Sequence, residues 1–96
     1  MTDRQILRHI GQNVKAARLR AGLTQECLAE LASIHWQTVS YVENGKFMFS
    51  IVTFVKISHA LEVSPNRLLE GIPEPETKRM ERIKKIMARK RQPRRF

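Results

Sequence analysis

Five side chains that carry hydrogen-bonding groups or aromatic rings fall close together in the segment "SIHWQTVSYVENG". They are Trp36, Gln37, Thr38, Ser40 and Tyr41. Val39 and Val42 add an apolar seam, which predicts a short helix with the five side chains on its other face. That face is uncharged, and its polar groups can both donate and accept hydrogen bonds. For Trp36 and Tyr41, the alternative to contact with a partner on this face is packing against a neighbouring residue.

The composition favours a small protein with an anionic partner. The 96 residues carry a formal net charge of +9, which points to nucleic acid, an acidic membrane surface or an acidic protein. The length allows one domain with a small core. No apolar run approaches the roughly 18–20 residues that span a bilayer, and the N-terminus lacks the long apolar stretch of a secretory signal. The single cysteine, Cys27, cannot form an internal disulfide, so we expect a cytoplasmic protein.

The charge is concentrated near the C-terminus. Residues 72–96 hold ten Lys or Arg and three Asp or Glu, whereas residues 1–71 hold eight and six. The two prolines of "GIPEPE" lie at this change and disfavour a continuing helix. The sequence therefore predicts a compact domain over residues 1–72 and a basic extension over residues 73–96.

The compact part is predicted to be all-α. One helix, from Asp3 to Arg20, is indicated by apolar residues at three- and four-residue spacing, with Thr2 or Asp3 as its cap and Gly22 at its end. The starts of four later helices share one pattern: a capping residue, an apolar residue directly before it, and a second apolar residue four positions after it. The two apolar residues can pack against each other across the cap as a hydrophobic staple. These sets are Leu23-Thr24-Leu28, Ile34-His35-Val39, Phe49-Ser50-Phe54 and Val63-Ser64-Leu68. They predict helices near residues 25–32, 36–43, 51–61 and 65–70, with His35 as the weakest cap.

Three apolar residues, Phe47, Met48 and Phe49, form an unusual cluster in a predicted loop. Phe49 is expected to pack on Phe54 as a staple residue, with Phe47 partly buried beside it. The alternative is an exposed patch that binds a partner.

The second and third predicted helices are joined by about three residues, which is a helix-turn-helix arrangement. A small residue, Ala29, lies where the two helices would cross, and Ile34 is apolar inside the turn. Through these features and "GLTQECLAELA", "VSYVENGK" and "TFVKISHALEVSPNRLL", the chain resembles the Cro/repressor-type helix-turn-helix proteins, often called the XRE family. The resemblance covers Ile10 to Leu69. It implies a five-helix DNA-binding domain that reads operator DNA, usually as a dimer with its last helix at the interface.

The resemblance implies roles for individual residues. Gln25 would meet a phosphate with its side chain and nearby backbone N–H groups, and the turn with Asn44 and Lys46 would hold another phosphate. The residues expected at the major groove or its flanking phosphates are Trp36, Gln37, Thr38, Ser40 and Tyr41. Base edges offer donors, acceptors and the thymine methyl, whereas phosphates mostly supply affinity. Lysines therefore belong around this face and not on it, which accounts for its lack of charge.

Arg18 and Glu43 match a pair that forms an internal ion pair between the first helix and the recognition helix. Two departures from the family pattern stand out. Ser33 occupies the turn position where the family prefers glycine, so a positive φ there would cost about 1 kcal/mol. The loop "KFMFS" lacks the additional basic residues that many members place beside DNA, which leaves Lys46 as its phosphate-binding candidate.

No feature of the sequence supports catalysis, a cofactor or a metal site. His9, His35 and His59 are scattered and have no second cysteine to complete a ligand set. Cys27 is expected to be a free thiol on the outer side of its helix. A cysteine nucleophile would need a histidine beside it in a pocket.

The extension carries an apolar stripe on a helix predicted over residues 75–90, followed by the basic end "RKRQPRRF". The stripe consists of Met80, Ile83, Ile86 and Met87. Three roles remain open: a solvated tail with nonspecific attraction to DNA, a helix that packs on the domain or pairs across a dimer, and a membrane-surface element.

These features predict a nucleoid-associated transcriptional regulator that binds double-stranded DNA as a homodimer on a roughly palindromic operator. The alternative is an antitoxin that represses its own operon and holds a toxin protein through the extension or the surface around Phe47 and Phe49. An RNA-binding module is disfavoured, because no sheet is predicted that could carry stacking aromatics.

Overall fold

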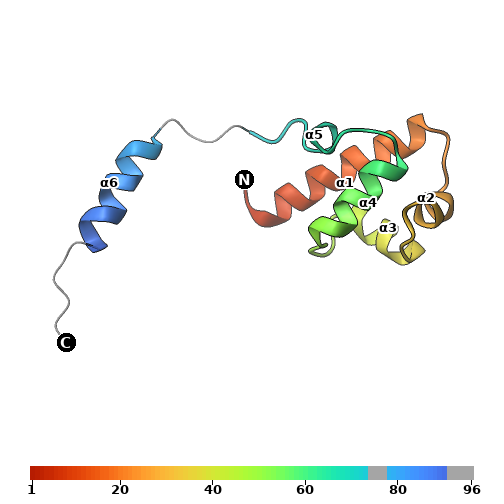
Figure 1. The fold of residues 1–96 in the computed structure, drawn as a ribbon, viewed down its shortest axis with the longest axis horizontal. Coiled ribbons are helices and arrows are strands. Elements are labelled where there is room, and N and C mark those ends of the chain that lie inside the picture. The colour runs from red at the N-terminus through yellow and green to blue at the C-terminus, as the bar shows by residue number, and fades with distance from the viewer. Residues whose placement is uncertain (74–77, 91–96) are drawn as a thin grey trace.

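The computed structural model describes residues 1–73 and 78–90, and all regular secondary structure within them is helical. The elements are α1 (Asp3–Arg20), α2 (Gln25–Ala32), α3 (Trp36–Glu43), α4 (Ile51–Ala60), α5 (Pro65–Leu68) and α6 (Arg79–Lys90) (Figure 1). The all-α prediction is confirmed. The helices α4 and α5 end slightly earlier than expected. Part of the predicted start of the last helix lies outside the described residues.

The predicted capping residues begin five of these helices, with one difference in detail. The Thr2 hydroxyl accepts a hydrogen bond from the Gln5 backbone N–H at 3.2 Å, and the Gln5 side chain accepts one from the Thr2 N–H at 2.9 Å. His35, expected to be a weak cap, accepts from the Gln37 N–H through Nδ1 at 3.2 Å. Ser64 makes no side-chain capping bond. At that end Pro65 has no N–H to satisfy, and its ring already sets a helical φ.

Four helix ends use a residue in the left-handed region: Gly22, Ser33, Gly45 and Glu62. In each case the next backbone N–H donates to a carbonyl five residues back, as the Ile34 N–H does to the Ala29 oxygen at 3.0 Å. This is the Schellman arrangement. At three of the four ends the residue after the left-handed position is apolar and packs against the core, namely Leu23, Ile34 and Val63. The same residue therefore closes one helix and begins the staple of the next.

Ser33 has φ 56° and ψ 45°. This turn position therefore has the positive φ at which serine is expected to be less favourable than glycine. A β-carbon is disfavoured in this region because it approaches the following carbonyl. We expect Ser33→Gly to raise the free energy of unfolding by roughly 0.5–1 kcal/mol, after allowance for the greater freedom of glycine in the unfolded chain. Thermal unfolding measures the effect. Ser64→Gly, at φ −70°, is the control and should destabilise; equal shifts in the two variants would contradict the argument.

The core lies between the five helices α1 to α5. Helix α1 packs on α3 and α5, helix α2 packs on α3 and α4, and helix α4 also packs on α5. Phe49 stacks on Phe54 with ring centroids 6.2 Å apart, and Phe47 meets Phe49 edge-on at 6.5 Å. Both loop phenylalanines are partly buried against the core, which confirms core packing for them. Met48 differs, because it is 73% exposed.

Two side chains of α1 hold the short helix α5 in place. The Asn13 amide donates to the carbonyl oxygens of Leu68 and Glu70, both at 2.9 Å, and His9 Nε2 lies 2.6 Å from the Glu70 oxygen. A single helical turn leaves its last carbonyls without partners. These α1 side chains supply them across more than fifty residues of sequence, a pairing that the sequence did not indicate.

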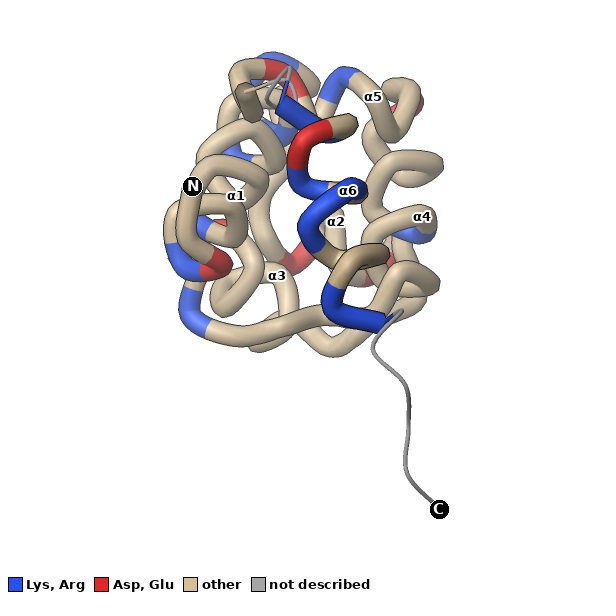
Figure 2. The backbone as a smooth tube through the Cα atoms, turned by 90° about the vertical axis from the view of Figure 1, so that its left-hand side faces the viewer, with Lys and Arg blue, Asp and Glu red and all other residues tan. Residues whose placement is uncertain are grey.

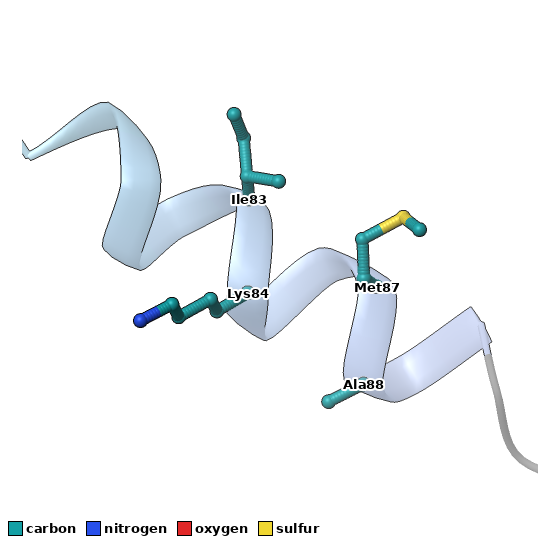
Figure 3. Close-up of a pocket in the computed structure, with 4 residues that line it drawn as sticks. All are labelled: Ile83, Lys84, Met87 and Ala88. Atoms are coloured by element: carbon teal, nitrogen blue, oxygen red, sulfur yellow. The ribbon is translucent and has the colours of Figure 1, made fainter.

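The helix α6 lies apart from the five-helix body in Figure 1, and none of its residues is buried. Ile83 and Met87 project from the same side of the helix (Figure 3), and both are exposed, by 37% and 48%. The rest of α6 is dominated by Lys and Arg, with Glu81 as its single acidic residue (Figure 2). The apolar stripe thus has no packing partner within the described residues of the chain.

Candidate nucleic-acid interface

The helix α3 buries one face and presents the other. Val39 and Val42 are completely buried against α1 and α2. The outward face carries the residues predicted from the sequence, with Trp36, Gln37 and Tyr41 exposed and Thr38 and Ser40 partly exposed. The helix-turn-helix pair therefore brings these five side chains together on one accessible surface without a charged group among them.

A buried ion pair fixes α3 against α1. Arg18 Nε donates to Glu43 Oε2 at 2.7 Å and Arg18 Nη2 donates to Glu43 Oε1 at 3.0 Å, so the contact is bidentate. Arg18 is 8% exposed and Glu43 6%. The hydrogen bond to Glu43 raises the pKa of Arg18 above its ordinary value and outweighs the opposite effect of burial. A third donor, Arg18 Nη1, caps the Leu23 carbonyl at 2.8 Å.

Gln25 belongs to the same network. Its side-chain amide donates to Glu43 Oε1 at 3.1 Å, and the residue is only partly exposed. The side chain expected at a phosphate thus connects the start of α2 to the end of α3. This hydrogen bond fixes the position of the Gln25 amide. The sequence indicated the Arg18–Glu43 pair but not this third member.

The two aromatic residues of the face both pack on neighbours and remain accessible. Trp36 stacks on His35 with centroids 6.0 Å apart, and Tyr41 meets Phe47 edge-on at 5.6 Å. Their exposed fractions are 48% and 46%. Packing and surface contact are therefore not exclusive for these residues, because the geometry allows each ring to do both. The neighbouring rings restrict the motion of both side chains.

The turn after α3 is arranged partly by its own side chains. The Asn44 amide donates to the Ser40 carbonyl at 2.8 Å, where it caps the end of the helix. Gly45 has φ 65°, and the Lys46 N–H closes the turn on the Tyr41 carbonyl at 3.1 Å. Lys46 is exposed. Of the two residues expected to hold phosphate here, Lys46 forms no ion pair within residues 1–73 and 78–90, and Asn44 already uses one amide donor within the turn.

Gly11 decides how closely α1 approaches α3. A β-carbon at this position would lie 2.3 Å from the Val42 carbonyl oxygen and 2.8 Å from that of Glu43. Those atoms belong to the backbone and cannot move alone. Gly11 is buried, so the end of the recognition helix rests directly on the α1 backbone. Sequence reasoning missed this contact, because a single glycine inside a helical pattern does not reveal what crosses it.

In residues 1–73 and 78–90, no three His, Cys, Asp or Glu side chains gather where they could hold a metal ion. Cys27 is exposed. Among the described helices, none has the length and apolar character needed to cross a bilayer.

Comparison with known proteins agrees with this geometry. The helix-turn-helix model called HTH_3 matches residues 14–68. No curated protein matches by sequence. The restriction-modification controller protein C.AhdI from Aeromonas hydrophila is similar in structure, with 35% identity, a TM-score of 0.63 and coverage of 65% of this chain and 94% of its own.

Two further solved structures are similar over more of the chain. A hypothetical transcription factor from Neisseria, NHTF, has 28% identity and a TM-score of 0.63, and the match covers 84% of this chain and 90% of the other. The SinR/SinI protein complex has 28% identity and a TM-score of 0.62, with 83% and 80% covered. The family model spans more than half of the residues, and the chain therefore belongs to the HTH_3, or XRE-type, family of helix-turn-helix DNA-binding transcription regulators.

Proposed function

We propose that the protein is a sequence-specific transcriptional regulator that reads duplex DNA with the outward face of α3. The observation that carries this proposal is the uncharged hydrogen-bonding face itself, held by the buried pair of Arg18 and Glu43. Base edges in the major groove are distinguished by donors, acceptors and methyl groups. A rigidly held helix with amide, hydroxyl and aromatic groups suits that task, and Lys46 and Gln25 lie at its margins for phosphate contact.

We further propose that it acts as a homodimer on a roughly palindromic site. A shallow apolar groove near α5 supports this, because it joins exposed side chains of the α4 start and the α5 end. Its lining includes Phe49, Ile51, Phe54 and Leu69. Ile51 is 72% exposed and Leu69 38%, and clustered apolar exposure of this kind is typical of an interface. Two recognition helices would then enter major grooves about 34 Å apart.

Selection of bound sequences from random duplex DNA tests the proposal directly. Enrichment of a palindrome is the expected result, since two identical subunits read two half-sites. Enrichment of a single half-site would remove the dimer while keeping the sequence-specific reader. Absence of any enrichment would refute base recognition and leave only charge-driven binding.

Gln37 is the residue for which we predict the largest share of base specificity. It lies early on α3 and is exposed, where a side-chain amide can pair with adenine through two hydrogen bonds. Gln37→Ala should weaken binding to the selected site by roughly 1–3 kcal/mol and binding to random DNA far less. Fluorescence anisotropy on both duplexes measures the difference. Equal losses on the two would mean that the side chain touches only the backbone.

The division into a domain over residues 1–72 and a basic extension over residues 73–96 is part of the same proposal. We assign nonspecific DNA attraction to the extension. Deletion of residues 89–96 should weaken binding to all sequences by similar factors and flatten the salt dependence, because each phosphate contact contributes about 0.9 to the log–log slope. The deletion leaves both the apolar groove near α5 and the apolar stripe at 80–87 in place, so the dimer should persist. An unchanged slope would show that the end of the chain does not reach the duplex.

A protein partner is the second candidate role of the extension, and the exposed stripe on α6 favours it. The SinR/SinI structure is a complex between two proteins. An antitoxin that represses its own operon would use a surface such as the exposed stripe on α6 to bind its toxin.

The similarity to C.AhdI suggests control of restriction-modification genes as another setting. The neighbouring genes distinguish the two settings. An antitoxin requires a gene for a small toxin beside its own, and a restriction-modification controller requires genes for a methyltransferase and its endonuclease.

A further inference from the structure

A row of basic side chains runs along the edge of α1 beside α3. Arg4, Arg8 and Lys15 share a face with Gly11, because they follow the three- and four-residue spacing of a helix. Gly11 is the position that touches the end of α3. The three cations therefore lie along the side of α1 against which α3 packs. All three are exposed, and α1 carries several basic positions in Figure 2.

Two contacts place the start of this row beside the turn that follows α3. A β-carbon on Gly45 would lie 2.7 Å from the Arg8 Cα, so the α1 backbone passes directly against the turn at this point. One turn earlier, Arg4 lines a surface groove together with Lys46, Phe47 and Met48. Phe47 also contacts Tyr41 on the outward face of α3. The groove is thus continuous with the face proposed to read the bases.

Within the part of the chain that the structure describes, no acidic side chain forms an ion pair with this row. Among residues 1–73 and 78–90, the ion pair within 4.0 Å is that of Arg18 and Glu43. The acidic residue of the groove is Asp3, in the first turn of α1. Arg4 and Lys46 therefore place two positive charges against one negative charge in the groove, and Arg8 and Lys15 continue the row along α1. Unpaired exposed cations next to a base-reading surface are what a phosphodiester backbone binds.

We infer that the α1 basic row, Arg4, Arg8 and Lys15, binds the phosphodiester backbone of duplex DNA next to the groove occupied by α3. The inference rests on the proposed function and extends the DNA contact from the helix-turn-helix pair to the first helix. It also accounts for the loop "KFMFS" with its single lysine, Lys46. Cations that the loop lacks are supplied by α1, which passes beside it.

Paired charge-matched variants of the full chain test the inference. Arg4→Gln/Arg8→Gln removes two charges from the row. The control, Arg20→Gln/Lys56→Gln, removes two exposed charges elsewhere, from the opposite face of α1 and from α4. The measurement is the dissociation constant on the selected duplex and on random duplex at several salt concentrations. Thermal unfolding of each variant confirms that the fold is kept.

We expect the row variant to bind both duplexes roughly threefold to thirtyfold more weakly than wild type. Its log–log salt slope should be shallower by about 1–2, one phosphate contact for each side chain. The control should change affinity by less than about twofold. Asp3→Asn should shift affinity in the opposite direction, because it removes the acidic group of the groove.

Row and control variants with equal affinities and equal slopes would overturn the inference while leaving the proposed function intact, since the wild type would still enrich its site. Loss of affinity on the selected duplex alone would also overturn it, because backbone contacts weaken binding to all sequences. A wild-type protein that enriches no sequence and binds no duplex would instead overturn the proposed function, and the inference with it.

Discussion

Replacing Glu43 with glutamine is expected to lower the free energy of unfolding by about 3–5 kcal/mol, because it leaves the buried Arg18 guanidinium without its counter-charge. Glu43 is 6% exposed and accepts hydrogen bonds from both Arg18 and Gln25. A glutamine amide offers one acceptor oxygen in place of two. Thermal and denaturant unfolding measure the loss, and DNA affinity should fall on every sequence, since α3 is no longer held against α1.

Two further variants calibrate this expectation. Glu30→Gln makes the same chemical change at an exposed position of α2 and should alter stability by no more than about 0.5 kcal/mol. Gln25→Ala removes one hydrogen bond of the network and should cost about 0.5–1.5 kcal/mol. Wild-type stability in Glu43→Gln would show that the pair is solvated in solution and that α3 is positioned by apolar packing alone.

Gly11→Ala should be strongly disruptive although it adds a single carbon atom. The new β-carbon would lie 2.3 Å from the Val42 carbonyl oxygen, so α1 and α3 must separate. Overpacking of this kind costs about 1–3 kcal/mol or more, and the gain of up to about 1 kcal/mol from better helix propensity offsets only part of it. We expect a lower melting temperature and weaker binding to both selected and random DNA, because the end of α3 and the turn with Lys46 move together.

Gln12→Ala is the matched control for Gly11→Ala. Gln12 is the next residue of α1 and is exposed, so its truncation should leave stability within about 0.5 kcal/mol of wild type. A Gly11→Ala variant that melts with the wild type would mean that the two helices are farther apart than the structure places them.

Local chemistry determines most of the helix boundaries. The bounds of α1, α2 and α3 agree with those predicted from the sequence, because caps, staples and left-handed ends act between residues a few positions apart. The end of α5 differs from its prediction, since a one-turn helix depends on partners outside itself. Those partners are Asn13 and His9, whose bonds to the α5 end cross 55 to 61 residues of sequence.

The candidate site, like the helix boundaries, was predictable from the sequence only in part. The α3 face was predictable because its residues follow one another along a single helix with an apolar seam. The sequence alone did not reveal that Gln25 shares the Glu43 carboxylate with Arg18 or that Asn44 caps its own helix. Nor did it indicate that Arg4 shares a groove with Lys46. Which donor meets which acceptor depends on how the helices cross, and many pairings are compatible with the same periodicity.

By itself the sequence determined that this protein is helical, basic and a member of a helix-turn-helix family, because those properties reside in composition, spacing and short motifs. The tertiary structure alone decided how closely the recognition helix rests on α1, through the missing side chain of Gly11. It also decided which cations stand beside that helix and that Gln25 shares the Glu43 carboxylate with Arg18. These features depend on distances between residues remote in sequence, and such distances exist only once the core has closed.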